Sequence, residues 1–187
     1  MRTSSLQLSS LKLPSLKLPS LRLSSLRYCL YGFILLASIA FAEVPINNRL
    51  LNGLSAAEAR LTLIETAKSY LGTPYRYAGL SKKGLDCSGF VYVSFKEGLG
   101  HETPRSAGST YAWAEKITTA ELQPGDLVFF VTTGPGISHV GIYMGEGRFI
   151  HSASQGPVTG VIYSYLNESY WKRTYKGAGR ALPLDAD

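Results

Sequence analysis

The sequence GLDCSGFVYVSF, residues 84–95, decides how this chain folds, because it places a cysteine at the start of an apolar helix. Asp86 is of a residue type favoured at helix N-caps, so it predicts that the helix begins at Cys87. The apolar residues from Phe90 to Phe95 recur at helical spacing and give this helix one buried face. A cysteine that only fills a core would more naturally lie in the middle of such a helix.

The position of Cys87 has a chemical consequence. A thiol at a helix N-terminus lies at the positive end of the helix dipole, beside backbone N–H groups that have no helical partner. Together with a basic partner, this position is predicted to lower the pKa of Cys87 and to give a thiolate nucleophile at neutral pH. The same N–H groups can hold an oxyanion, and the small residues Ser88 and Gly89 are expected to leave room for a substrate.

Two of the three histidines can supply the basic partner. A turn at residues 144–148 separates His139 from His151, and pairing of the two ends of this turn places His151 opposite Gly141. The two rings are then diagonal neighbours, about 7–8 Å apart at Cα, whereas a register change of one residue would place them on opposite faces. In a cysteine hydrolase, His139 would be the base and His151 would fix its tautomer. His101 is expected to be a surface loop residue.

The rest of the chain predicts helices first and strands afterwards. The capping-box pattern SAAE at residues 55–58 begins a helix over about 56–71, and the turn PGD at 124–126 opens the β region. Short runs rich in β-forming residues then predict the strands Leu127–Val131, His139–Met144, Arg148–Ser152 and Val158–Ser164. The predicted fold class is α+β, with N-terminal helices packed on an antiparallel meander.

The net charge of +6 is concentrated in the first 42 of the 187 residues. That segment holds five of the 19 basic residues and no acidic residue, so the remainder has 14 basic and 13 acidic residues. The main body is nearly neutral, which argues against nucleic-acid binding by bulk electrostatic attraction.

The same 42 residues have the pattern of an export signal. The apolar run LYGFILLASIAFA, residues 30–42, ends in a small-x-small cleavage pattern at Ala42. At about 1.5 Å per residue it spans roughly 20 Å, less than the hydrocarbon core of about 30 Å, so a membrane anchor is less favoured than a cleavable signal. Cys29 precedes this run, unlike the lipid-modified cysteine of a lipoprotein, and removal of the signal would leave Cys87 without a disulfide partner.

We therefore expect an exported protein in four parts, located in the periplasm or cell envelope without a stable membrane anchor. They are a signal peptide with a long repetitive n-region (1–42), a short segment (43–55), the main domain (56–183) and a C-terminal tail (184–187).

Six segments follow one another in the order found in a known family. They are YLGTPYRY (70–77), GLDCSGFV (84–91), PRS (104–106), LQPGDLVFF (122–130), SHVGIY (138–143) and FIH (149–151). In these segments the chain resembles the NlpC/P60 cysteine peptidases, papain-like enzymes that cut the peptide stems of bacterial peptidoglycan. The resemblance covers roughly residues 57–183. The segments SKKG (81–84) and NESYW (167–171) make it most similar to the Spr/MepS-type murein endopeptidases.

The resemblance implies a papain-like NlpC/P60 catalytic domain with the triad Cys87, His139 and His151, and with no metal or cofactor. A tyrosine hydroxyl would lie beside the thiolate. Substrate or oxyanion contacts are predicted at Tyr75, Asp86, Ser88 and Arg105. The predicted partner is peptidoglycan, with the D-alanyl–diaminopimelate cross-link as the favoured bond.

Several alternatives stay open from the sequence. The bond cut could be D-glutamyl–diaminopimelate, and a papain-like acyltransferase would share the cysteine and histidine. A zinc site of Cys87, His139 and His151, two unrelated histidines, or a wall-binding module without activity are less favoured. A regulatory protease or adaptor is also left open.

Overall fold

The computed structural model describes residues 53–182. The predicted signal peptide (1–42), Cys29 and the tail 184–187 lie outside the described residues, as does most of the segment 43–55. Over the described range, no helix is both long and apolar enough to cross a bilayer. The helices are α2 (Ala56–Lys68), α3 (Cys87–Leu99), α4 (Ala107–Trp113), the 3₁₀ helix η2 (Thr119–Glu121) and α5 (Ser169–Thr174).

Between residues 53 and 182, the main sheet has six antiparallel strands in the order β3-β8-β4-β5-β6-β7, and β1 and β2 form a separate hairpin. The strands are β1 (Leu80–Ser81), β2 (Gly84–Leu85), β3 (Glu115–Ile117), β4 (Leu127–Phe130), β5 (His139–Gly145), β6 (Arg148–Ala153), β7 (Gly160–Tyr165) and β8 (Tyr175–Arg180). The predicted α+β class is confirmed, and β4 to β7 form the predicted meander. The sequence did not predict β3 and β8, because YKGAGR in β8 contains two glycines and forms a strand only through its pairing with β3 and β4.

Local capping interactions explain where the two long helices begin. The Ser55 and Glu58 side chains each bond the other residue's backbone N–H, as the capping box predicts. The Asp86 carboxylate accepts the Gly89 N–H at 2.6 Å, so α3 begins at Cys87 as expected. Helix α2 ends at Lys68 rather than near residue 71, because the chain tightens into turns before Gly72, whose φ is +79°.

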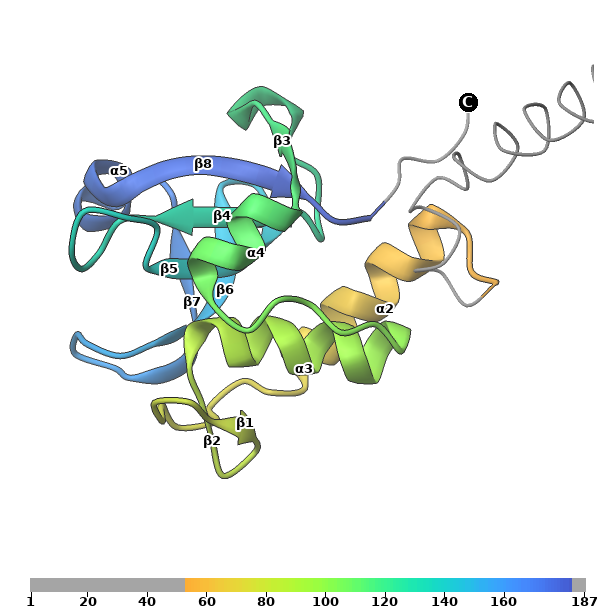
Figure 1. Cartoon of the computed structure of the whole chain (residues 1–187), viewed down its shortest axis with the longest axis horizontal. Coiled ribbons are helices and arrows are strands. Elements are labelled where there is room, and N and C mark those ends of the chain that lie inside the picture. Colours follow the sequence, from red (N-terminus) through yellow and green to blue (C-terminus); the bar gives the residue numbers. More distant parts are fainter. Residues whose placement is uncertain (1–52, 183–187) are drawn as a thin grey trace, which may run out of the picture. The chain divides into compact units, whose positions relative to one another are not determined.

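Alternate residues of β4 face opposite sides of the sheet. Leu127 and Phe129 join the core that contains α2 and α3, and α3 contacts both α2 and the strands β5 and β6 (Figure 1). Val128 and Phe130 instead pack with Trp171 of α5 on the other face. The sheet therefore has an apolar layer on each side, and the second layer is small and aromatic.

A buried ionic cluster joins three distant segments at the start of β4. The Asp126 carboxylate, fully buried, accepts hydrogen bonds from Arg60 of α2 at 3.1 Å and from Arg180 of β8 at 2.8 and 3.1 Å. It also accepts the backbone N–H of Gln123, which closes the turn before β4. Both carboxylate oxygens are thus satisfied, and the cluster joins helix α2 and strand β8 to the turn before β4.

The register of the β5–β6 hairpin is the one the sequence predicted, apart from its turn. Ile142 pairs with Ile150 and Tyr143 with Phe149, but Arg148 pairs with Gly145 rather than with Met144. A bulge at this end shifts the register by one residue, and it is accommodated by positive φ angles in the turn, 93° at Gly145 among them.

Candidate active site

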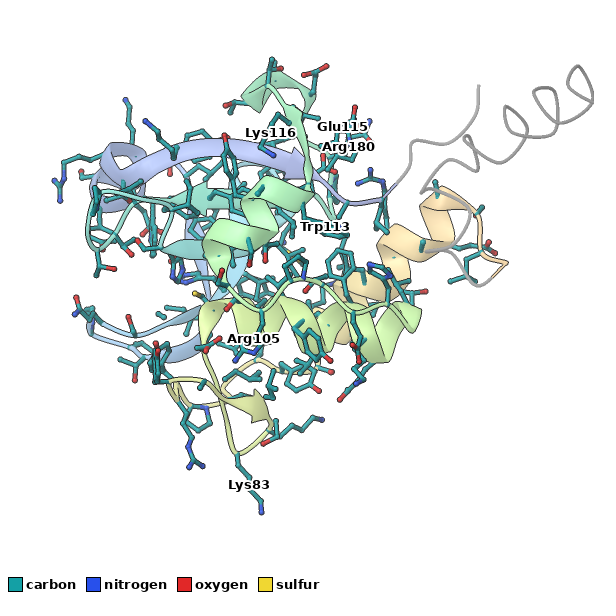
Figure 2. All side chains as sticks on the ribbon, viewed as in Figure 1. Lys83, Arg105, Trp113, Glu115, Lys116 and Arg180 are labelled. Carbon is teal, nitrogen blue, oxygen red and sulfur yellow. The ribbon has the colours of Figure 1, made fainter. Side chains whose placement is uncertain are left out.

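Cys87 is the first residue of α3, and three of the predicted site residues brace this helix start. Arg105 forms a bidentate ion pair with Asp86, at 2.9 and 3.0 Å. The Ser88 hydroxyl donates to the backbone carbonyl of Arg105 at 2.8 Å. Figure 2 labels Arg105 beside α3. Because Asp86 is at once the N-cap and the partner of Arg105, these side chains hold Cys87 in place. Their predicted contact with a substrate stays a prediction.

Gly89 has a different role from the one expected. The sequence suggested that it leaves room for a substrate, but a Cβ atom at Gly89 would lie 2.2 Å from the carbonyl oxygen of Gly79. Gly89 is therefore needed so that the loop carrying Tyr75 can pack directly against α3. This expectation was wrong because the space beside Gly89 is filled by another part of the protein.

The structure brings His139 and His151 into direct contact on neighbouring strands. His139 Nε2 lies 2.9 Å from His151 Nδ1, and both residues are buried. His151 Nε2 in turn lies 3.1 Å from the Ser164 hydroxyl of β7. Gly141 lies between the two histidines on β5, and a Cβ there would be 3.1 Å from His151 Cβ, so the glycine permits their close approach. The two rings are thus direct neighbours, as the base-and-orienter prediction requires.

Two residues beside these rings were not assigned a role from the sequence. The Trp171 ring stacks on His139, with centroids 5.2 Å apart, and meets His151 edge-on at 4.7 Å. Ser164 ends the hydrogen-bonded series. Ser164 could have been predicted if the register of β6 against β7 had been derived from the sequence. Ser164 pairs with Phe149, which lies on the same face of β6 as His151.

His101 is not the surface residue that was expected. Its ring is half-buried and stacks on Trp113, which is labelled in Figure 2, with centroids 5.7 Å apart. It is also absent from the residues that line the hollows around His139.

Two hollows meet at His139. The first, of about 630 Å³, contains Cys87, Tyr75, Tyr77 and Arg105 in its lining. The second, of about 500 Å³, is lined by the loop of residues 154–158, by Ser164 and by residues of the α5 region. The linings of the two hollows share Thr132, Thr133, His139 and Ser154, so the hollows adjoin at these residues.

The sequence profile of the NlpC/P60 family matches residues 72–180 of the chain, which is more than half of its length. The chain belongs to the NlpC/P60 family. This confirms the resemblance found from the sequence motifs, and the matched region includes Cys87, both histidines of the pair and Ser164.

Individual relatives agree with this assignment to the NlpC/P60 family. The chain is 38% identical to the murein DD-endopeptidase MepS/murein LD-carboxypeptidase of Escherichia coli K12. This match extends over 125 residues, which are 67% of this chain and 64% of that protein. The chain is 42% identical over 126 residues to the gamma-DL-glutamyl hydrolase of Bacillus subtilis, covering 66% of this chain and 30% of that protein. The matched region is thus less than two thirds of either relative.

A solved structure gives the same result for the NlpC/P60 fold. A crystal structure of an NlpC/P60 family protein from Bacillus cereus superposes with a TM-score of 0.60 at 36% identity. The superposition covers 66% of this chain and 40% of that one.

The protonation state of the cysteine in this NlpC/P60 domain differs from the one predicted. Burial raises the pKa of the Cys87 thiol above its ordinary value of 9.0, and the Asp86 carboxylate raises it further. Backbone N–H groups of Val140, Ser88 and Cys87 act in the opposite direction without outweighing burial. The sequence prediction was wrong because it counted the helix dipole but could not count desolvation. In this resting state the Cys87 sulfur lies 3.9 Å from the carbonyl oxygen of Ser138, to which a thiol can donate.

The histidines of the NlpC/P60 domain are also held in their neutral form. Burial lowers the pKa of His139 from 6.5 to about 4 and that of His151 well below 6.5. Near pH 7 both imidazoles are therefore neutral, and a neutral imidazole can accept a proton. Among the described residues, no three or more His, Cys, Asp or Glu side chains are grouped in a way that could hold a metal ion.

These shifts predict how stability depends on pH. The folded-state pKa of each histidine lies below the unfolded value of about 6.5, so protonation favours the unfolded state. The free energy of unfolding should be insensitive to these groups above pH 6.5 and should fall by about 1.4 kcal/mol per pH unit per histidine below it. Urea denaturation at pH 7.0 and 5.5 should thus show a loss of about 2–3 kcal/mol from the two histidines together. Equal stability at the two pH values would show that neither imidazole is held neutral by burial.

Proposed function

We propose that this chain is a cysteine endopeptidase that hydrolyses the peptide stems or cross-links of bacterial peptidoglycan, with Cys87 as nucleophile, His139 as base and His151 as the third residue. The observation that carries the proposal is the contact between His139 and His151, because His139 lines the same hollow as Cys87. The names of the E. coli and B. subtilis relatives support the same class of reaction.

The geometry supports a sequence of proton transfers that starts from a neutral thiol and a neutral imidazole. His139 Nε2 is occupied by His151, so Nδ1 is the nitrogen that can take the proton from the Cys87 thiol. The sulfur then bonds to the substrate carbonyl carbon, and backbone N–H groups at the start of α3 stabilise the oxyanion. The protonated His139 gives its proton to the leaving amine. Water then hydrolyses the thioester and regenerates the thiol.

The two hollows on either side of His139 support cleavage inside a chain rather than at its end. A peptide bound across Cys87 can extend into the first hollow on one side and into the second on the other. The half-buried Tyr75 lines the first hollow, which is compatible with its proposed contact with the oxyanion or substrate.

The bond that is cut has two candidates. The D-alanyl–diaminopimelate cross-link is favoured by the similarity to the E. coli murein DD-endopeptidase, and the γ-D-glutamyl–diaminopimelate bond by the similarity to the B. subtilis gamma-DL-glutamyl hydrolase. Mass spectrometry of digested muropeptides separates them. Cleavage of the first bond converts cross-linked dimers into intact monomers. Cleavage of the second also shortens monomers, and a digest in which neither changes contradicts the proposal.

We further propose that the protein acts outside the cytoplasmic membrane, where peptidoglycan lies, after removal of residues 1–42. N-terminal sequencing of exported protein should find Glu43 as the first residue. An intact Met1, or a fatty-acylated Cys29, would contradict removal of the signal at Ala42.

A further inference from the structure

The hydrogen-bonded series that leads away from Cys87 ends at Ser164. His151 is fully buried and Ser164 is 6% exposed, so water has little access to the bond between them. His151 uses Nδ1 toward His139 at 2.9 Å and Nε2 toward the Ser164 hydroxyl at 3.1 Å. A neutral imidazole has one donor nitrogen and one acceptor nitrogen, so the two bonds of His151 are coupled.

Only one of the two possible arrangements leaves His139 able to act as a base. If Ser164 accepts a proton from His151 Nε2, then His151 Nδ1 is an acceptor and His139 carries its proton on Nε2, which leaves His139 Nδ1 free. If Ser164 donates instead, both hydrogen bonds of His151 run in the opposite direction. His139 Nδ1 is then protonated and cannot take the thiol proton.

Ser164 has a way to remain an acceptor. It lines the second hollow, so its own hydroxyl hydrogen can be donated to water or to a substrate oxygen there while its lone pair accepts from His151. The hydroxyl is thus placed between the ring of His151 and the part of the cleft that lies beyond His139.

We propose that Ser164 is a positioning residue, which accepts the Nε2 proton of His151 and thereby keeps His139 in the tautomer that can deprotonate Cys87. The inference rests on the proposed catalytic roles of Cys87 and His139. It adds Ser164 to the proposed triad and connects His139, through His151, to the second hollow.

The direct test is the nitrogen NMR spectrum of the histidines near pH 7, where both rings are neutral. In the unmodified protein His139 and His151 should each carry the proton on Nε2. A proton on Nδ1 of His151 would overturn the proposal. This measurement needs no substrate, so it remains valid even if the chain does not cleave peptidoglycan.

Variants provide the second test. In Ser164→Ala the His151 signals should show a shifted tautomer population, and kcat on muropeptides should fall about 10- to 100-fold while KM changes little. Ser164→Thr, which restores a hydroxyl, should recover both the tautomer and most of kcat. The matched control is Ser94→Ala, which removes a buried hydroxyl that bonds to the Phe90 carbonyl within α3.

The outcomes are distinguishable. A lower melting temperature in Ser164→Ala, with unchanged tautomers and unchanged kcat, would show that Ser164 is only structural and would overturn the proposal. If Ser164→Ala does not fold, the spectrum of the unmodified protein still decides. Absence of peptidoglycan cleavage by the unmodified protein would count against the proposed function, whereas the tautomer measurement tests Ser164 separately.

Discussion

Replacement of Cys87 by alanine should abolish peptidoglycan hydrolysis and leave the fold intact. Cys87 supplies the thiol in the lining of the first hollow, and removing one member of such a catalytic unit lowers activity by at least about 10³-fold. The fold should persist because the helix start is held by Asp86, Arg105 and Ser88 rather than by the thiol. Muropeptide digestion gives the activity, and circular dichroism with a melting curve gives the fold.

The matched control is removal of the chain's other cysteine. Cys29→Ala, in the same full-length protein, should leave activity unchanged because Cys29 precedes the predicted cleavage site. Cleavage by Cys87→Ala at the normal rate would eliminate Cys87 as the nucleophile. Loss of activity in both variants would point to a requirement for cysteine unrelated to the cleft.

Replacement of Asp126 by alanine should strongly destabilise the fold. It would leave the guanidinium groups of Arg60 and Arg180 without their buried carboxylate, and breaking such a cluster typically costs about 3–5 kcal/mol. For a domain of this size, the melting temperature should fall by more than about 10 °C. Thermal denaturation followed by circular dichroism measures this shift.

Glu65→Ala is the control for Asp126→Ala. Glu65 pairs with Lys68 at 2.7 Å on the exposed side of α2, where solvent screens the interaction. Its removal should change the melting temperature by no more than about 2 °C. Equal effects of the two substitutions would contradict the structural role assigned to the buried cluster.

The Cys87 thiol and the His139 imidazole are both neutral in the resting state. Burial disfavours charge on both the Cys87 thiol and the His139 imidazole, so the proposed mechanism requires proton transfer between them rather than a preformed thiolate. Residues that fix the tautomer of His139 therefore matter more than surface charges near the cleft. Trp171, stacked on the ring, contributes to this state by excluding water.

The sequence by itself determined the features that depend on neighbours along the chain. Asp86 fixed the start of α3 at Cys87, because N-capping acts over three residues. The hairpin formed by β5 and β6 let the meeting of His139 with His151 be predicted, although the pairing at the turn differs by one residue and a bulge restores the predicted register.

Only the tertiary structure decided what surrounds these residues. The pairing of Asp126 with Arg60 and Arg180 joins residues at least 54 positions apart in the sequence, and no local pattern marks it. The roles of Gly89 and His101 likewise depended on which distant segment packs beside them. The prediction that Cys87 is a thiolate was wrong for the same reason. A helix dipole is built by consecutive residues, whereas desolvation is the sum of everything that the fold brings around the thiol.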